Sequence, residues 1–296
     1  MPLSPWELLS LITRVVTYFG VAAAIGGSFI MLLSRDLPQL RQSLRGYCTL
    51  GLWLGLLATG LGFFIQVALF AELGISGLWH WPTAGILWNT NLGTSVQLRL
   101  GGLLLGLALF WAGGLGGNKY LVLRGWLAYG VMALLLSTSF VAVGHTVQLS
   151  PFIRLLLIVH LLFVAGWIGS LWPLVRACEL LPSNTLALLM RRFGRLAIVG
   201  VPLLGVAGVT MAYQLLGSVE VLVGTVYGQL LLVKLVLFVV LLWLAAMNKW
   251  RWLPALSSRE DAAAPLARSI RWELAVALVV FTLTAVLSSL LGPEVM

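Results

Sequence analysis

The chain has 296 residues, of which 60% are hydrophobic and only 9% are charged, and its mean hydropathy is +1.04. Soluble domains carry about 25% charged residues, so the composition excludes a soluble globular protein. The formal net charge is +9. Alternating segments of about ten residues, which are typical of a transmembrane β-barrel, do not occur. The predicted fold is therefore an all-α, polytopic membrane helical bundle.

Eight apolar runs are long enough to cross a hydrocarbon core of about 30 Å as helices. The first run is longer than the hydrophobic region of a cleavable signal and has no basic segment before it, so we interpret it as a retained helix. In chain order, the eight predicted transmembrane helices cover residues 8–33, 47–70, 96–113, 121–143, 152–175, 196–217, 227–248 and 268–291.

Lysines and arginines gather in the loops on one side of these predicted helices. Four alternate loops, at 34–46, 114–124, 176–195 and 249–271, hold all but four of the 18 cations. The positive-inside rule places these loops in the cytoplasm and both termini in the periplasm. Because membrane topology accounts for the excess of basic over acidic residues, nucleic-acid binding is not expected. The sequence predicts a multi-pass protein of the bacterial inner membrane.

The other four cations, Arg14, Arg99, Arg154 and Lys234, fall within predicted helices. Charges inside a membrane are costly and usually face a bundle interior or a wet cavity. The alternative is that the side chains snorkel to the outer headgroups. Snorkelling suits Arg99 and Arg154, which are close to a helix boundary. It suits Lys234 less well, because this lysine lies about two turns into its helix, and both interpretations stay open for it.

Two segments share a pattern that indicates an internal repeat. The segments TNLGTSVQLRL (90–100) and TVYGQLLLVKL (225–235) both follow T-x-x-G-x5-[RK]-L, each at the start of a predicted helix. Parallel repeats are a known transporter architecture. We predict two four-helix halves in the same orientation, residues 1–139 and 140–296, within one integrated membrane domain.

Two of the three histidines, His145 and His160, lie in sequence that is typical of a membrane interior. Ser150 and Pro151 form a helix-start signature, which puts His160 about 13 Å below the outer boundary. Imidazole suits copper, zinc, iron and haem, and the thioether of Met211 would select Cu(I). We predict His145, His160 and Met211 as metal ligands. The alternative for His160 is a hydrogen bond to a neighbouring helix.

A second, looser alignment joins the first and fifth predicted helices. IGGS (25–28) aligns with WIGS (167–170), which sets Tyr18 opposite His160. Trp167 follows His160 by two helical turns, so both side chains lie on one face. The candidates for lining a polar cavity are therefore Tyr18, Trp167, Lys234, Arg154, Arg99 and Arg14.

At these residues the sequence resembles the copper resistance protein D (CopD) family. The resemblance covers residues 140–291 well and the first half more loosely, through Arg99 and the T-x-x-G before it. In this sequence the aligned place in the first helix reads Tyr18, where many relatives are expected to have a histidine. The matching motifs, in order, are GH at 144–145, H-x5-GWIGS at 160–170, RRFGRLA at 191–197, TVYGQLLLVKL at 225–235, AMNK at 246–249 and RWEL at 271–274.

The resemblance implies an inner-membrane protein that moves or handles copper, often with a periplasmic partner of the CopC type. By resemblance, His145 and His160 are the copper ligands, while Asn248 and Glu273 are motif residues without an assigned role. Asn248 and Glu273 both lie on the cytoplasmic side, where we expect a structural polar contact between the seventh and eighth predicted helices. Membrane lipid and copper are the other expected partners, and no enzymatic activity or oligomeric state is predicted. The alternatives are a b-type haem redox protein, with histidines as axial ligands, and a non-catalytic scaffold or sensor.

Overall fold

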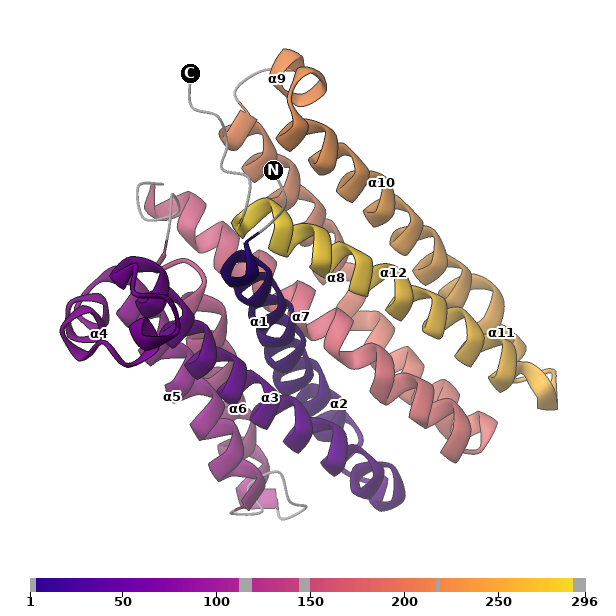
Figure 1. Ribbon diagram of the computed structural model, residues 1–296. Coiled ribbons are helices and arrows are strands. Elements are labelled where there is room, and N and C mark those ends of the chain that lie inside the picture. The colour runs from indigo at the N-terminus through magenta and orange to yellow at the C-terminus, as the bar shows by residue number, and fades with distance from the viewer. Residues whose placement is uncertain (1–3, 112–118, 144–149, 217–218, 290–296) are drawn as a thin grey trace.

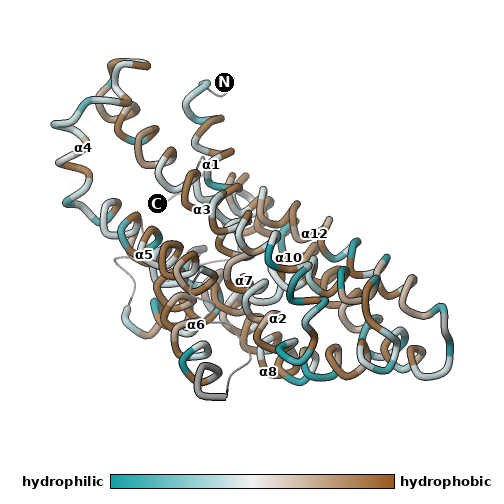
Figure 2. The backbone as a smooth tube through the Cα atoms, turned by 90° about the horizontal axis from the view of Figure 1, so that it is seen from below, coloured by the Kyte–Doolittle hydropathy of each residue, from teal (hydrophilic) through white to brown (hydrophobic). Residues whose placement is uncertain are grey.

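The computed structural model describes residues 4–111, 119–143, 150–216 and 219–289, and all regular structure in these residues is helical. The long helices lie side by side in an elongated bundle (Figure 1). Hydrophobic residues run along most of the length of each long helix (Figure 2). The predicted all-α membrane bundle is confirmed.

Seven continuous helical stretches within the described ranges are long and apolar enough to cross a membrane. Two of them contain more than one element, because the chain passes through a π-helical turn without leaving the helix. The stretches are α1 (Pro5–Ala22) with η1 (Ala23–Gly27) and α2 (Ser28–Leu33), α3 (Pro38–Ala71), α5 (Asn91–Trp111), α7 (Pro151–Leu180), α8 (Ser183–Leu216), α10 (Val226–Met247) with η4 (Asn248–Trp252) and α11 (Leu253–Ala255), and α12 (Ala263–Ser289).

The eighth predicted span falls on α6 (Lys119–Ser139), which packs against α5. The side chains of α6 are described only from Leu123 onward, so the number of eight spans stays a prediction. Four short helices lie between the long ones: η2 (Gly74–Trp79), α4 (Trp81–Trp88), α9 (Val219–Gly224) and η5 (Glu260–Ala262).

Capping residues set the starts of α1 and α7. In α1 the backbone N–H of Glu7 donates to Ser4 Oγ at 3.2 Å, and the backbone N–H of Ser4 donates to Glu7 Oε2 at 2.8 Å. This reciprocal pair satisfies two N–H groups that the first helical turn leaves without partners. In α7 the N–H of Ile153 donates to Ser150 Oγ at 3.4 Å, with Pro151 in the first helical position. The predicted helix start at residue 151 is confirmed.

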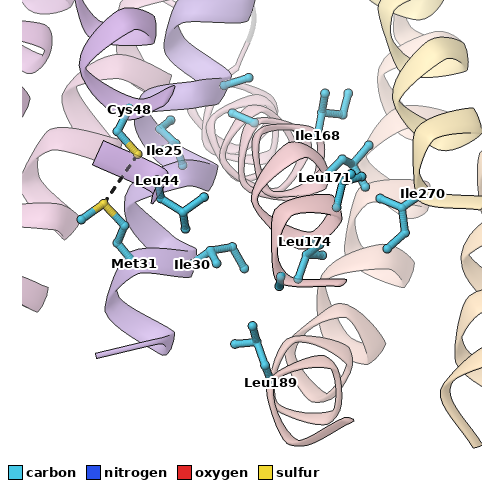
Figure 3. Packing of buried hydrophobic residues seen from close by; sticks show 14 of the residues in the cluster. Ile25, Ile30, Met31, Leu44, Cys48, Ile168, Leu171, Leu174, Leu189 and Ile270 are labelled. Atoms are coloured by element: carbon cyan, nitrogen blue, oxygen red, sulfur yellow. Dashed lines mark hydrogen bonds between the residues drawn. The ribbon is translucent and has the colours of Figure 1, made fainter. Parts of the chain in front are cut away.

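The largest core cluster lies where the first helical stretch crosses α7. Ile25 and Ile30 from the first stretch and Leu171 from α7 are almost completely buried. Figure 3 shows α7 between Ile25 and Ile30 on one side and Ile270 of α12 on the other. The Cys48 thiol of α3, one of the two free and buried cysteines, lies 3.7 Å from the sulfur of Met31.

At this crossing the backbones of η1 and α7 touch. The Ser170 hydroxyl donates to the Gly26 carbonyl at 3.2 Å, and the Tyr47 hydroxyl donates to the Gly169 carbonyl at 3.0 Å. A Cβ atom added to Gly169 would lie 1.7 Å from the Ala22 carbonyl oxygen. Small residues at membrane helix crossings permit such close approach. The aligned segments IGGS and WIGS therefore pack against each other.

The beginning of α1 and the end of α12 lie at one end of the bundle. Arg14 donates through Nη1 to the Ser288 carbonyl at 2.7 Å and to its hydroxyl at 3.1 Å. The Tyr18 hydroxyl is 3.1 Å from the same Ser288 oxygen. This placement agrees with termini on one side of the membrane, and the identity of that side stays a prediction.

Both copies of the T-x-x-G motif form the same local structure. Each threonine directly precedes a long helix and donates its hydroxyl to a carbonyl of the short helix before it. Thr90 donates to Leu87 O at 2.7 Å, and Thr225 donates to Val221 O at 2.7 Å. The division of the chain into two repeated halves stays a prediction, although this shared structure is what a repeat would produce.

The glycine of each copy packs against a carbonyl of that short helix. A Cβ atom on Gly93 would lie 1.9 Å from Trp88 O, and one on Gly228 would lie 2.3 Å from Leu222 O. We expect Gly228→Ala to destabilise the protein by about 2 kcal/mol, because the start of α10 must move. Thermal unfolding in detergent checks this, with Gly224→Ala as the control, since its Cβ would meet nothing within 4 Å. Equal midpoints for the two variants would contradict the prediction.

Candidate functional site

His160 lies on α7, facing α8, and is partly buried. Its Nδ1 atom is 3.3 Å from the carbonyl oxygen of Leu204. A carbonyl only accepts hydrogen bonds, so Nδ1 carries the hydrogen and Nε2 of the neutral ring keeps its lone pair. A histidine held in this way is oriented for metal binding through Nε2. The same bond is also the interhelical contact that was the alternative for this residue.

Met211 lies on the face of α8 that faces His160. A Cβ atom on Gly208 would lie 3.6 Å from His160 Cε1, so the imidazole passes directly over this glycine. Leu204, Gly208 and Met211 follow the i, i+4, i+7 spacing of one helical face. Met211 is therefore on the face that His160 contacts, about one turn beyond Gly208. The other predicted ligand, His145, lies outside the described residues.

Lys234 of α10 lies within electrostatic reach of His160 and is partly buried. The structure thus brings together two of the residues selected from the sequence, on helices α7 and α10. No ion pair to Lys234 is found among the described residues. This position favours the interpretation of Lys234 as a bundle-facing cation over that of a snorkelling one.

The three arginines within the apolar helices have different surroundings. Arg99 of α5 donates to the hydroxyls of Ser139 and Ser95, both at 3.2 Å, and its guanidinium lies 4.3 Å from the centre of the Phe140 ring. Its hydrogen bonds are made inside the bundle, so the snorkelling expected for it is not what this structure shows. Arg14 and Tyr18 lie within electrostatic reach of Arg99. Arg154 is exposed, as expected for a snorkelling residue.

A cavity of about 410 Å³ lies between α2, α6, α7 and α8. Its walls are mainly apolar, and Leu204, the carbonyl partner of His160, is one of the lining residues. Trp167 lines the cavity two turns further along α7. None of the described lining residues is a methionine, cysteine or histidine. The cavity therefore adjoins the histidine site without continuing its ligand chemistry.

Trp167 also joins a second group of buried polar side chains. It hydrogen-bonds the carboxylate of Glu273 on α12, and the Asn248 amide nitrogen of η4 donates to the same carboxylate. Glu273 is 3% exposed and Asn248 is 6% exposed. The polar contact between Asn248 and Glu273 was predicted from the sequence and is confirmed, whereas Trp167 was selected without being placed beside them.

In the part of the chain that the structure describes, no three histidine, cysteine, aspartate or glutamate side chains come together as a metal site. His145 lies outside the described residues, and methionine is not one of these four residue types. Only His160 and Met211 of the predicted ligands can be placed.

Comparison with known proteins identifies the C-terminal part of the chain. Residues 187–287 match the family model of copper resistance protein D, CopD. The resemblance to the CopD family is thereby confirmed. The matched region contains α10 and most of α8 and α12, and so includes Lys234, Asn248 and Glu273.

Two curated relatives extend the match beyond this region. The inner membrane protein YebZ of Escherichia coli is 32% identical over 139 residues, which is 44% of this chain and 47% of YebZ. The copper transport protein CutJ of Bacillus subtilis is 27% identical over 246 residues, which is 80% of this chain and 44% of CutJ. The chain spans less than half the length of either relative, and no solved structure matches it.

The apolar helices and these relatives agree on location. Among the described residues, seven helices are long and apolar enough to cross a membrane, and one relative is named as an inner membrane protein. The chain is a multi-pass protein of the inner membrane, as predicted.

Proposed function

We propose that this protein transports copper across the inner membrane, or handles it there in copper resistance, and that His160 binds the metal on the periplasmic half. The CopD match at residues 187–287 and the similarity to CutJ support the choice of copper. The single structural observation in its favour is the bond from His160 Nδ1 to the Leu204 carbonyl, which leaves Nε2 available.

Met211 and His145 would complete the coordination of the copper ion. A thioether and neutral imidazoles suit Cu(I), which accepts soft ligands and low coordination numbers. A periplasmic protein of the CopC type would deliver copper to this face.

The experiment that tests this proposal is metal and pigment analysis of the detergent-purified protein. Copper, zinc and iron are measured together with the visible spectrum, on the wild type, His160→Ala and His80→Ala. His80 is the matched control, because its Nδ1 lies 2.8 Å from the Thr83 hydroxyl at the start of α4, away from α7 and α8.

We expect stoichiometric copper in the wild type and in His80→Ala, and at least about tenfold less in His160→Ala, since loss of a ligand weakens metal binding at least as much as loss of its supporting contact. Iron with a haem spectrum would contradict copper binding and favour the redox protein. A colourless protein that takes up no metal after copper is offered would favour the scaffold or sensor.

A further inference from the structure

A buried carboxylate lies in the half of the bundle opposite to His160 and takes no part in the proposed copper site. Glu273 is 3% exposed on α12, a helix that crosses the membrane. Its described partners are neutral groups, the indole of Trp167 and the amide of Asn248. A carboxylate within a membrane span that pairs with no cation is costly and is functional by default.

The described charged groups on the elements that pack against α12 are paired, exposed or distant from Glu273. On α7, Arg154 is exposed and His160 lies about two turns before Trp167. On α7, Glu179 is paired with Arg271 at 2.7 Å and with Arg176. On η4, Lys249 and Arg251 lie over the rings of Trp250 and Trp252. Lys234 on α10 and Arg14 on α1, near Ser288, are about four helical turns away. Tyr18 on α1 lies against Phe281 and Ser288, about two to four turns away. Asp261 on η5 and Arg268 on α12 are exposed.

The partner amide suits a carboxyl group that changes its charge. The Asn248 nitrogen donates to Glu273, which is the arrangement for an ionised carboxylate. The Asn248 Oδ1 atom is buried and has no hydrogen-bond partner among the described residues. Turning the amide by half a rotation would present Oδ1 to a protonated carboxyl group, which donates one hydrogen bond. The same side chain can thus serve both charge states.

The backbone at Asn248 is also unusual. The π-helical turn η4 begins at this residue, directly after α10. Such turns inside long helices are frequent at functional sites. At this turn Asn248 is buried and donates to Glu273 of α12.

We propose that Glu273 is a proton-binding site within the membrane domain. The carboxylate takes up one proton from water and becomes a neutral carboxylic acid, and the reverse step returns both the proton and the negative charge. A sodium ion would be bound less well than a proton, because hard cations take about six oxygen ligands. Glu273 and Asn248 together offer only the carboxylate and one free amide oxygen.

Coupling of this proton to copper movement rests on the proposed function. Trp167 provides the physical link, because it bonds Glu273 and lines the cavity that Leu204 also lines. A change of charge at Glu273 would move the Trp167 indole, and with it the cavity next to the His160 site.

Infrared difference spectroscopy of the copper-free protein in lipid discs tests proton binding directly. Spectra are recorded between alkaline and acidic pH for the wild type, Glu273→Gln and Glu72→Gln. Glu72 is exposed at the end of α3 and serves as the control. Acidification protonates the exposed carboxyl groups as well, so we expect a separate protonated-carboxyl band, shifted by burial from that of the exposed acids. This band should grow on acidification, be lost in Glu273→Gln and persist in Glu72→Gln. An unchanged band in Glu273→Gln, or no such band in the wild type, would overturn the proposal.

A second measurement separates this proposal from that of copper transport. Copper movement into proteoliposomes is followed with and without a pH gradient. We expect Glu273→Gln to bind copper like the wild type while its rate no longer responds to the gradient. A normal response in Glu273→Gln would overturn the coupling. If no copper moves in any variant, the proposed function fails, and the infrared result still decides whether Glu273 binds a proton.

Discussion

Replacing Gly169 by alanine is expected to destabilise the protein by about 3 kcal/mol or more, the largest stability effect of any single methyl group considered. The added Cβ atom would lie 1.7 Å from the Ala22 carbonyl oxygen, and both atoms belong to backbones held in buried helices. Neither helix can yield without separating the first helical stretch from α7. The unfolding midpoint in detergent, followed by size-exclusion chromatography after heating, measures the loss.

Gly166→Ala is the matched control, because it lies one turn earlier on α7 and its Cβ would meet nothing within 4 Å. Alanine favours a helix over glycine by up to about 1 kcal/mol, so this variant should be as stable as the wild type or more so. Equal stability of Gly169→Ala and Gly166→Ala would contradict the close backbone contact between η1 and α7.

The second large effect is expected on copper movement. His160→Ala should slow copper transfer across proteoliposome membranes at least about tenfold, which corresponds to about 1.4 kcal/mol, because the ring nitrogen that binds the ion is gone. Met211→Leu should slow it less, since the imidazole remains and only the thioether is lost. A copper indicator inside the vesicles reports the rate.

His80→Ala should transfer copper at the wild-type rate, because its imidazole is engaged with Thr83 at the start of α4. If His160→Ala transferred copper at the wild-type rate, this histidine would not be part of the copper path. The folded state of each variant is checked by its elution from a sizing column, so that a loss of rate is not confused with a loss of structure.

The long helices and several of their ends could be predicted from sequence, because the signals are local. Apolar length determines whether a helix can cross the membrane, and the pair Ser150 and Pro151 marks a helix start wherever it occurs. The seven apolar helices and the start of α7 at Pro151 agree with these signals. The threonine and glycine of the two T-x-x-G copies likewise predicted a shared local structure, which both copies form.

The packing of the helices could not be predicted, because it depends on which faces meet. No sequence signal showed that Trp167 reaches Glu273, or that Arg99 is held by Ser95 and Ser139. Nor did any signal show that His160 lies over Gly208. Hydrophobic periodicity is weak in helices that are apolar on all sides, so the direction of each side chain is set by tertiary contacts.

The most direct test of the central claim is X-ray absorption spectroscopy of the copper-loaded protein, which counts the nitrogen and sulfur atoms bound to the metal. We predict imidazole nitrogen in the wild type and one fewer imidazole in His160→Ala, with one fewer sulfur in Met211→Leu. An identical copper environment in the wild type and His160→Ala would contradict the assignment of His160 as a ligand.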